Sequence, residues 1–343
     1  MTNTPDRFRK TEEASYRPKA ESAIGFPRDR TALLLIDPVN DFLSEGGAAW
    51  EMTKTTVKLH DVVGNLKRAL EGARAHGIPV LFGPMAYTEE DYRDMALHRR
   101  SGINRLMFET KMFLAGSWGA DFHPELQPQD EEVVLLPHKG TDVFETDLPG
   151  HLQRLGVTHL VIAGMTANLC CEGTGRHATE HGYDVTFLSD AIGSESVPSY
   201  EAAVKLNYPL IGNAVMKVDE FLLALDQGTD DAPARPGDRV LGSDHLEIGT
   251  AEEVVAASDI HEAYMRVPRG ILFEKDTYIP LDTVVKRAGG VVFINLPRLV
   301  VSKMPWSEPP TRAERREKVG RPIAQVEQLY RSRSPTTHER QPA

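Results

Sequence analysis

Short, wholly apolar runs alternate with amphipathic stretches over the first two thirds of the chain. The apolar runs predict strands buried on both faces, because a half-buried strand would alternate apolar and polar residues. The amphipathic stretches carry apolar residues at helical spacing and predict helices at 57–77, 147–156 and 171–182. The predicted strands lie at 31–37, 78–84, 132–139, 158–164 and 184–190. This alternation predicts an α/β fold of three layers, α/β/α, with a mostly parallel central sheet.

The composition changes after residue 227, which predicts a domain boundary. Residues 228–237 are rich in Pro, Gly and Asp and have no periodicity, so we interpret them as a linker. Residues 238–306 contain short apolar runs between Gly and Pro turns, a pattern typical of a small all-β barrel. The α/β domain is therefore expected at 30–227. Residues 1–29 are expected to form an N-terminal arm, and 307–343 a disordered Arg- and Pro-rich tail with a transient helix near 320–331.

Charge and composition narrow the class of protein. The 343 residues carry a formal charge of −11 and are 41% hydrophobic, which favours a globular protein and argues against nucleic acid as the main ligand. No apolar run approaches the roughly 20 residues that span a bilayer, and the first residues lack the apolar core of a secretory signal. We therefore expect no membrane partner and a cytoplasmic protein. The only two cysteines are adjacent, at 170 and 171, which suits a reducing compartment.

Three reactive side chains follow the ends of predicted strands. Asp37 ends the first strand, Lys139 ends the third, and Cys170 opens the helix after the fourth, where the positive end of the helix would favour thiolate over thiol. The carboxyl ends of parallel strands meet at one edge, which is where open α/β sheets bind ligands. A carboxylate beside the sulfur can take the thiol proton and return it to a leaving amine, while an ammonium stabilises both anions. This set predicts an acyl-transfer hydrolase.

Each of these residues also has a simpler interpretation when it is considered alone. Asp37 could be a turn or cap residue, Lys139 could be a solvated lysine, and Cys170 could be a small buried hydrophobe. Their joint placement at one sheet edge favours the chemical interpretation. His177 lies seven residues along the helix from Cys170, roughly 10 Å at 1.5 Å per residue, so it is expected to be structural.

Three sequence blocks carry a resemblance to a known family. They are LLLIDPVNDF with Asp37, LLPHKGTDVFETDL with Lys139, and IAGMTANLCCEGTGRHA with Cys170. Residues 30–225 resemble the isochorismatase-like cysteine hydrolases, which include nicotinamidases, N-carbamoylsarcosine amidohydrolases and ureidoacrylate amidohydrolases. The resemblance implies that Cys170 is the nucleophile, Asp37 the general base and acid, and Lys139 the cationic partner. It implies a cis peptide bond between Met165 and Thr166, and an oxyanion hole formed by the amides of Thr166 and Cys170. Cys171 would be core packing.

The segment between the second and third predicted strands bears on substrate and metal. Nicotinamidases carry an Asp-x-His element and a further His there as metal ligands, and GPMAYTEEDYRDMALHRRSG contains no such element. We therefore expect no metal and no cofactor, with Asp91 and His98 as surface polar groups. Residues 87–122 are long for a connection and are predicted to form a lid, although its aromatic residues could instead only pin the loop to the core. The predicted pocket residues are Asn40, Phe42, Tyr87, Phe108, Phe113 and Trp118.

The leading functional hypothesis is a cysteine-dependent hydrolase that cleaves an amide, carbamoyl or ureide bond of a small molecule through a thioester on Cys170. True isochorismatases generally lack the cysteine, so Cys170 favours an amidase. The alternatives are isochorismatase-type hydrolysis of another small metabolite and a binding or scaffold protein. Residues 238–306 resemble a PRC-barrel, which suggests a protein partner or a role in assembly. The hydrolase resemblance implies a homo-oligomer.

Overall fold

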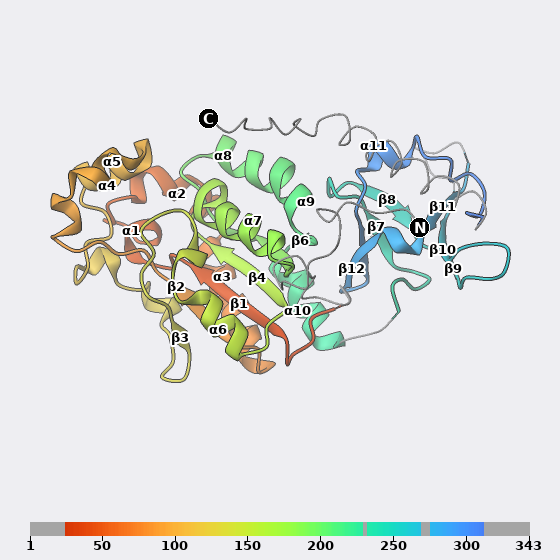
Figure 1. Cartoon of the computed structure of the whole chain (residues 1–343), viewed down its shortest axis with the longest axis horizontal. Coiled ribbons are helices and arrows are strands. Elements are labelled where there is room, and N and C mark those ends of the chain that lie inside the picture. The colour runs from red at the N-terminus through yellow and green to blue at the C-terminus, as the bar shows by residue number, and fades with distance from the viewer. Residues whose placement is uncertain (1–24, 229–231, 269–274, 312–343) are drawn as a thin grey trace, which may run out of the picture.

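The computed structural model describes residues 25–228, 232–268 and 275–311 (Figure 1). Most of the predicted N-terminal arm, and the tail from 312 with its predicted transient helix, lie outside the described residues. The first unit is built on a six-stranded parallel sheet with the order β3-β2-β1-β4-β5-β6. Its strands are β1 (Thr31–Ile36), β2 (Val80–Gly83), β3 (Val133–Val134), β4 (His159–Gly164), β5 (Asp184–Ile192) and β6 (Ala214–Met216).

The two central strands are the apolar runs that the sequence pattern marks most strongly. All six residues of β1 and all six of β4 are buried, and Leu33 and Leu34 pair in register with Val161 and Ile162. Helices cover both faces of the sheet, so no position in these strands meets water. The predicted α/β fold with a parallel sheet is confirmed. The edge strand β3 is shorter than expected, because it keeps two residues of the predicted 132–139. The other edge strand, β6, has three residues and is not among the predicted strands.

The helices form the outer two layers. α6 and α7 lie in front of the sheet in Figure 1, while α3 lies behind it and packs against α10. The single helix predicted at 57–77 is wrong, because Asp61 adopts a left-handed conformation with φ 47° and divides it into α2 and α3. The α-helices of this unit are α1 (Asn40–Leu43), α2 (Trp50–Leu59), α3 (Val62–Ala75), α4 (Met95–Arg100), α5 (Gly102–Glu109), α6 (Leu148–Arg154), α7 (Glu172–Glu180), α8 (Val197–Glu201), α9 (Tyr208–Ile211) and α10 (Val218–Gln227).

The chain beyond residue 238 forms two small sheets. One has the order β11-β10-β9 and the other β12-β13-β7-β8, and a short helix, α11 (Arg298–Val301), follows. The expected small β unit is therefore present, while its likeness to a PRC-barrel stays a prediction. The strands are β7 (Arg239–Leu241), β8 (Glu247–Thr250), β9 (Glu253–Val255), β10 (Tyr264–Val267), β11 (Thr277–Pro280), β12 (Val284–Ala288) and β13 (Val291–Ile294). None of the helices in the described ranges is both long and apolar enough to cross a membrane.

A buried ion pair joins the β unit to the parallel sheet. Lys286 on β12 donates to Asp184 at the start of β5 over 2.7 Å, and both side chains are at most 1% exposed. The Lys286 ammonium also lies 4.4 Å from the ring centroid of Phe26. Nearby, Leu241 and Phe293 of the β unit belong to the same apolar core as the α/β unit. We call this contact between the β unit and the α/β unit, centred on Lys286 and Asp184, the seam. Because Asp184 is the first residue of its strand, the seam lies at the edge of the sheet opposite to the carboxyl ends.

We expect Lys286→Ala to destabilise the protein strongly, because it leaves the Asp184 carboxylate buried without its cation. Losing one partner of a buried pair costs about 3–5 kcal/mol. Arg239→Ala is the matched control, because its bridge to Glu247 over 3.0 Å is half exposed on both sides and such pairs contribute about 1 kcal/mol or less. Chemical denaturation of both variants measures the difference. Equal free energies of unfolding for the two variants would contradict a structural role for the seam.

Candidate active site

Asp37 stands at the carboxyl end of the central strand β1. Its backbone N–H donates to the Gly83 carbonyl at the end of β2, and its φ of 50° lies in the left-handed region that non-glycine residues rarely adopt. The side chain is fully buried. The strand end thus turns a carboxylate inward beneath the pocket described below, as the sequence predicts for this position.

His138 is the cationic partner that the structure places beside Asp37. Its Nε2 lies 2.9 Å from Asp37 Oδ1, and its Nδ1 lies 2.6 Å from the Gly140 carbonyl oxygen. The Gly140 carbonyl can only accept, so Nδ1 carries a proton, and Nε2 donates to Asp37 when that side chain is a carboxylate; the ring is then an imidazolium. Burial alone lowers the pKa of His138, but the charge of Asp37 and the two hydrogen bonds outweigh it and raise that pKa. A buried ion pair therefore lies under the pocket.

Lys139, predicted as the cationic partner, points elsewhere. Its ammonium lies 2.6 and 2.5 Å from the two carboxylate oxygens of Asp91, and its side chain is 43% exposed. Consecutive side chains of an extended segment point to opposite sides, so only one of His138 and Lys139 can face Asp37. The structure brings Asp37 and Cys170 together but not Lys139. The sequence reasoning missed His138, although it stands one position before the chosen lysine in the same block.

Cys170 lies in a turn of π-helix, η7 (Ala167–Cys171), that leads from β4 into α7. Its sulfur, an oxygen of Asp37 and a ring nitrogen of His138 all lie within 4.8 Å of one another. The expectation that the helix end favours thiolate is wrong for the resting state. Burial and the charge of Asp37 raise the pKa of Cys170 well above its usual value, and a backbone hydrogen bond from Thr166 opposes this only in part. The resting group is a thiol.

Two buried polar atoms beside the sulfur lack a hydrogen-bond partner within the described part of the chain. One is Asp37 Oδ2, the carboxylate oxygen that His138 does not use, and the other is Thr166 Oγ1. An unpaired buried acceptor is costly, so such atoms point to a ligand or to a proton transfer. The peptide bond between Met165 and Thr166 is cis, as the resemblance implies. Cys171 is fully buried, in agreement with a packing role.

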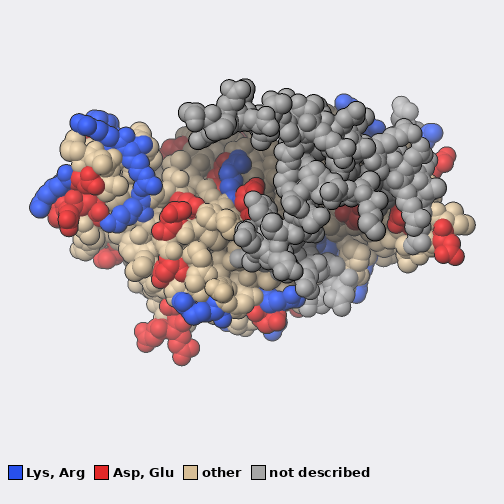
Figure 2. All heavy atoms as spheres, viewed as in Figure 1, with Lys and Arg blue, Asp and Glu red and all other residues tan. Residues whose placement is uncertain are grey.

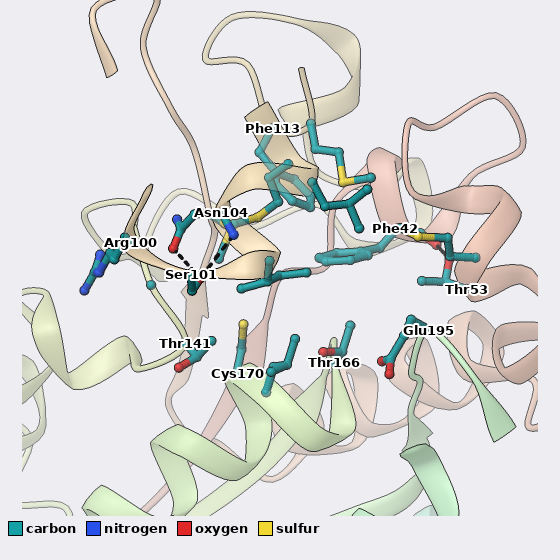
Figure 3. Close-up of a pocket in the computed structure, with 18 residues that line it drawn as sticks. Phe42, Thr53, Arg100, Ser101, Asn104, Phe113, Thr141, Thr166, Cys170 and Glu195 are labelled. Atoms are coloured by element: carbon teal, nitrogen blue, oxygen red, sulfur yellow. Dashed lines mark hydrogen bonds between the residues drawn. The ribbon is translucent and has the colours of Figure 1, made fainter. Parts of the chain in front are cut away.

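A cavity of about 480 Å³ opens above the Cys170 sulfur. Figure 3 shows the sulfur pointing into it from η7, with Thr166 and Thr141 near the same level and Phe42 and Phe113 opposite. The lining is formed by Phe42, Met52, Thr53, Met85, Arg100, Ser101, Ile103, Asn104, Leu106, Met107, Met112, Phe113, Gly140, Thr141, Thr166, Leu169, Cys170 and Glu195. Its volume suits a small organic molecule.

Of the six predicted pocket residues, Phe42 and Phe113 line this cavity and the other four do not. Tyr87 and Phe108 pack edge to face with ring centroids 5.0 Å apart beneath the lid, and the Trp118 side chain is 52% exposed. Asn40 donates to the Trp118 carbonyl over 2.9 Å, so it fixes the segment that follows the lid helices and does not line the cavity. Among the lid aromatics, Phe113 thus forms part of the pocket wall, whereas Phe108 pins the lid to the core.

The lid is anchored by a residue that sequence reasoning did not select. Asp41, directly after Asn40, accepts from the backbone N–H of Phe113 over 2.6 Å and from that of Ala48 over 2.8 Å. Phe113 then packs against Phe42 with ring centroids 4.7 Å apart. On the other side, Arg100 donates to the Lys139 carbonyl over 2.8 Å. Asp41 and the Lys139 loop therefore fix the two margins of the lid.

Two clusters in the described residues have side chains of the kinds that bind metals. Asp37, His138 and Cys170 form one, and Asp142, Glu145 and His177 the other. In the first, the 2.9 Å contact between Asp37 and His138 is a hydrogen bond, whereas two ligands on a tetrahedral zinc, each about 2.0–2.1 Å from the ion, lie farther apart. In the second, Asp142 and His177 bond to each other over 2.7 Å. In each cluster, two of the three groups are thus hydrogen-bonded to each other.

Comparisons with known proteins agree with this fold. The family model "Isochorismatase domain" matches residues 31–220. A ureidoacrylate amidohydrolase RutB of Pantoea ananatis is 29% identical over 243 residues, which cover 67% of this chain and 94% of that protein. RutB of Serratia proteamaculans is 30% identical, with 60% and 86% covered. The crystal structure of a cysteine hydrolase from Pseudomonas syringae pv. phaseolicola has 21% identity and a TM-score of 0.50, with 59% and 95% covered, and supports the fold alone.

A parallel α/β sheet whose carboxyl edge gathers a buried carboxylate, an imidazole and a thiol under a small-molecule pocket is the architecture of a hydrolase. The chain belongs to the isochorismatase family, because the family model matches more than half of its length.

Proposed function

We propose that the protein is an amidohydrolase that cleaves a non-peptide C–N bond of a small molecule, with Cys170 as nucleophile, Asp37 as proton carrier and His138 as the cation. The observation that supports this most directly is the contact of three reactive groups under one cavity, all within 4.8 Å. The RutB relatives, named as ureidoacrylate amidohydrolases, support the bond type. The proposal keeps the predicted chemistry and replaces Lys139 with His138.

The first half of the reaction forms a thioester. Asp37 takes the Cys170 proton on the oxygen that His138 leaves free, and the sulfur attacks the substrate carbonyl carbon. The carbonyl oxygen becomes an oxyanion, for which the backbone N–H groups of Thr166 and Cys170 are the proposed donors. Asp37 then passes its proton to the leaving nitrogen, the C–N bond breaks, and ammonia or an amine departs.

The second half releases the acid. Water enters the place of the leaving group, Asp37 takes its proton, and the hydroxide attacks the thioester carbon. The C–S bond breaks and the sulfur recovers the proton from Asp37, which restores the resting thiol. His138 keeps its proton throughout, and it stabilises Asp37 as a carboxylate and fixes its orientation. The raised pKa of Cys170 means that the nucleophile is generated only when Asp37 takes the proton.

The test is ammonia release from a panel of small primary amides, carbamoyl compounds and ureides, combined with an acid quench of the reacting enzyme. We expect turnover of at least one class and an acyl adduct on the peptide that contains Cys170, detected by mass spectrometry. Turnover without any adduct on that peptide, even when a slow deacylating substrate is used, would overturn the thioester mechanism.

The scaffold alternative predicts a different result. A binding protein acting through residues 238–306 would show no turnover and a stable partner on the β unit. The Asp37, His138 and Cys170 set favours the enzyme, because a buried carboxylate oxygen without a partner beside a thiol is costly for the fold and serves proton transfer. A homo-oligomer and a cytoplasmic location remain expectations that sizing and localisation experiments would test.

A further inference from the structure

The roof of the cavity is almost entirely apolar. Above the Cys170 sulfur, the α/β unit contributes one set of apolar side chains and the lid contributes another. The first set is Phe42, Met52 and Met85, and the second is Ile103, Leu106, Met107, Met112 and Phe113. Thioether side chains are flexible and polarisable, so such a wall adapts to flat or branched apolar groups.

The lid helix α5 separates charge from the cavity. Ile103 and Met107 are four residues apart, which places them on one face of the helix, and both line the cavity. Arg99 and Arg105 are exposed on the outside of the lid. Figure 2 shows Lys and Arg side chains gathered on the surface where Figure 1 places α4 and α5. Arg99 and Arg105 therefore face solvent, and Arg100 is the basic lid residue that lines the cavity in the described structure.

Two charged side chains line the cavity, Arg100 and Glu195, and hydrogen bonds hold both of them away from the sulfur. Arg100 donates to the Lys139 carbonyl over 2.8 Å, and in Figure 3 its guanidinium is turned away from Cys170. Glu195 accepts from the Ser194 hydroxyl over 2.7 Å and from the Asn168 amide over 3.3 Å. Neither charge is directed at the space above the sulfur.

The polar groups of the upper wall are also satisfied. Thr53 donates to the Phe42 carbonyl over 2.6 Å, and Ser101 donates to the Asn104 side chain over 2.8 Å. The unpaired hydroxyl of Thr166 lies at the floor, beside Cys170. The free polar group of the lining thus lies near the reacting sulfur, beside the apolar Leu169, and the roof is apolar. This division matches a substrate with one polar end.

We propose that the substrate is an uncharged amide, carbamate or ureide whose remaining part is apolar, such as an aromatic ring or a branched hydrocarbon. This inference rests on the proposed function. The amide end would lie at the floor with Cys170 and Thr166, and the apolar end would lie among Met107, Met112 and Phe113. A carboxylate on the apolar end would lose its water without gaining a cation, which is strongly unfavourable. We therefore expect compounds with a carboxylate at the apolar end to be poorer substrates.

A matched pair of compounds tests the proposal. 4-Methylbenzamide and 4-carbamoylbenzoate have the same ring and amide and differ in a methyl group against a carboxylate. We expect kcat/KM of the wild type to be at least about tenfold higher for the methyl compound, since a polar group placed in an apolar pocket lowers kcat/KM by more than about tenfold. Ureidoacrylate, the compound in the relatives' names, serves as a second carboxylate-bearing substrate.

Binding to Cys170→Ala separates the two proposals, because it needs no catalysis. Calorimetry is expected to detect 4-methylbenzamide and to show at least about tenfold weaker binding of 4-carbamoylbenzoate. Equal or tighter binding of the carboxylate, or binding of neither compound, would overturn the apolar-substrate inference. Apolar selectivity in binding without turnover by the wild type would support the apolar ligand preference of the cavity and count against the amidohydrolase proposal.

A positive charge placed on the lid should weaken the preference for the methyl compound over the carboxylate. Ile103→Lys puts an ammonium on the half-buried cavity face of α5, and we expect it to lower the preference for the methyl compound at least about tenfold. Met95→Lys is the matched control, because Met95 is a 54% exposed lid residue outside the cavity lining. An unchanged preference in a folded Ile103→Lys protein would contradict the assignment of this wall to the apolar end of the substrate.

Discussion

Cys170→Ala is expected to lower kcat/KM by about 10⁴-fold or more, because removal of a covalent nucleophile leaves only binding and electrostatic catalysis. The chain supplies its own control at the next position. Cys171 is also fully buried and also has a raised pKa from burial, but it does not line the cavity. We expect Cys171→Ala to change kcat/KM by less than about threefold, because its sulfur does not touch the reacting atoms.

Ammonia release on the two variants provides the comparison, and circular dichroism and thermal unfolding establish that both are folded. Cys171→Ala removes a buried sulfur and should cost about 1–2 kcal/mol of stability, whereas Cys170→Ala should cost little, since it also removes a poorly compensated group beside Asp37. If a folded Cys171→Ala protein lost more activity than Cys170→Ala, Cys171 would be the nucleophile and Cys170 the packing residue. Near-wild-type turnover by Cys170→Ala would exclude thiol catalysis altogether.

The sequence is most informative where one physical effect dominates. β1 and β4 are fully apolar, and this pattern is decisive because the strands are buried on both faces. Asp37 and Cys170 follow from the same logic, since the end of a parallel strand determines the edge where a side chain lies. The edge strand β6 is too short to give a periodic signal, and the apolar run at 132–139 overstates β3, which keeps only two residues. The break at Asp61 is also invisible in the pattern, because the apolar positions of α2 and α3 run on at helical spacing through it.

The choice between His138 and Lys139 shows the limit of motif reasoning. A motif identifies a segment, but the rotation of that segment decides which of two adjacent side chains faces inward. Here Met85 pairs with His138 as an isolated parallel bridge, and this pairing fixes the rotation. The pairing depends on residues about fifty positions apart, so no local signal carries it. The cavity lining was missed for a similar reason: the lid folds α5 inward, and Met107 and Met112 line the cavity while Phe108 turns into the core.

Lys139 then has a different task, which its contacts define. Its ammonium bonds to Asp91 in the lid, and its carbonyl accepts from Arg100, so the residue ties the lid to the loop that carries His138. An exposed pair of this kind contributes modest stability. The Lys139–Asp91 pair matters for where it lies, because the loop of His138 and Lys139 contacts both the lid and, through His138, the Asp37 carboxylate. Substitutions at Lys139 should therefore act on substrate retention more than on the chemical step.

His138→Ala is expected to lower kcat by about 10²–10⁴-fold, the range of a general acid–base device that has lost its supporting charge. Without the imidazolium, Asp37 is a buried carboxylate with no cation. The carboxylate then lacks the hydrogen bond that orients it toward the thiol, so proton transfer from Cys170 becomes slower. Lys139→Ala is the adjacent control. We expect it to raise KM by less than about tenfold and to leave kcat nearly unchanged. The substrate and the transition state would lose the same binding energy, so the barrier of the chemical step would not change. A large loss of kcat in Lys139→Ala, with His138→Ala active, would restore the lysine as catalytic partner.

The pH profile identifies the cation independently. The pKa of His138 is raised above its usual value of 6.5, so its pairing with Asp37 is complete below that value and is lost as the pH rises through the raised pKa. We expect the kcat/KM profile of the wild type to fall on its alkaline side at a pH above 6.5. His138→Lys should recover part of the activity that His138→Ala loses and move the falling limb to higher pH, because a lysine holds its proton up to a usual pKa of about 10.4. An alkaline limb at the same pH in His138→Lys and wild type would show that another group controls it.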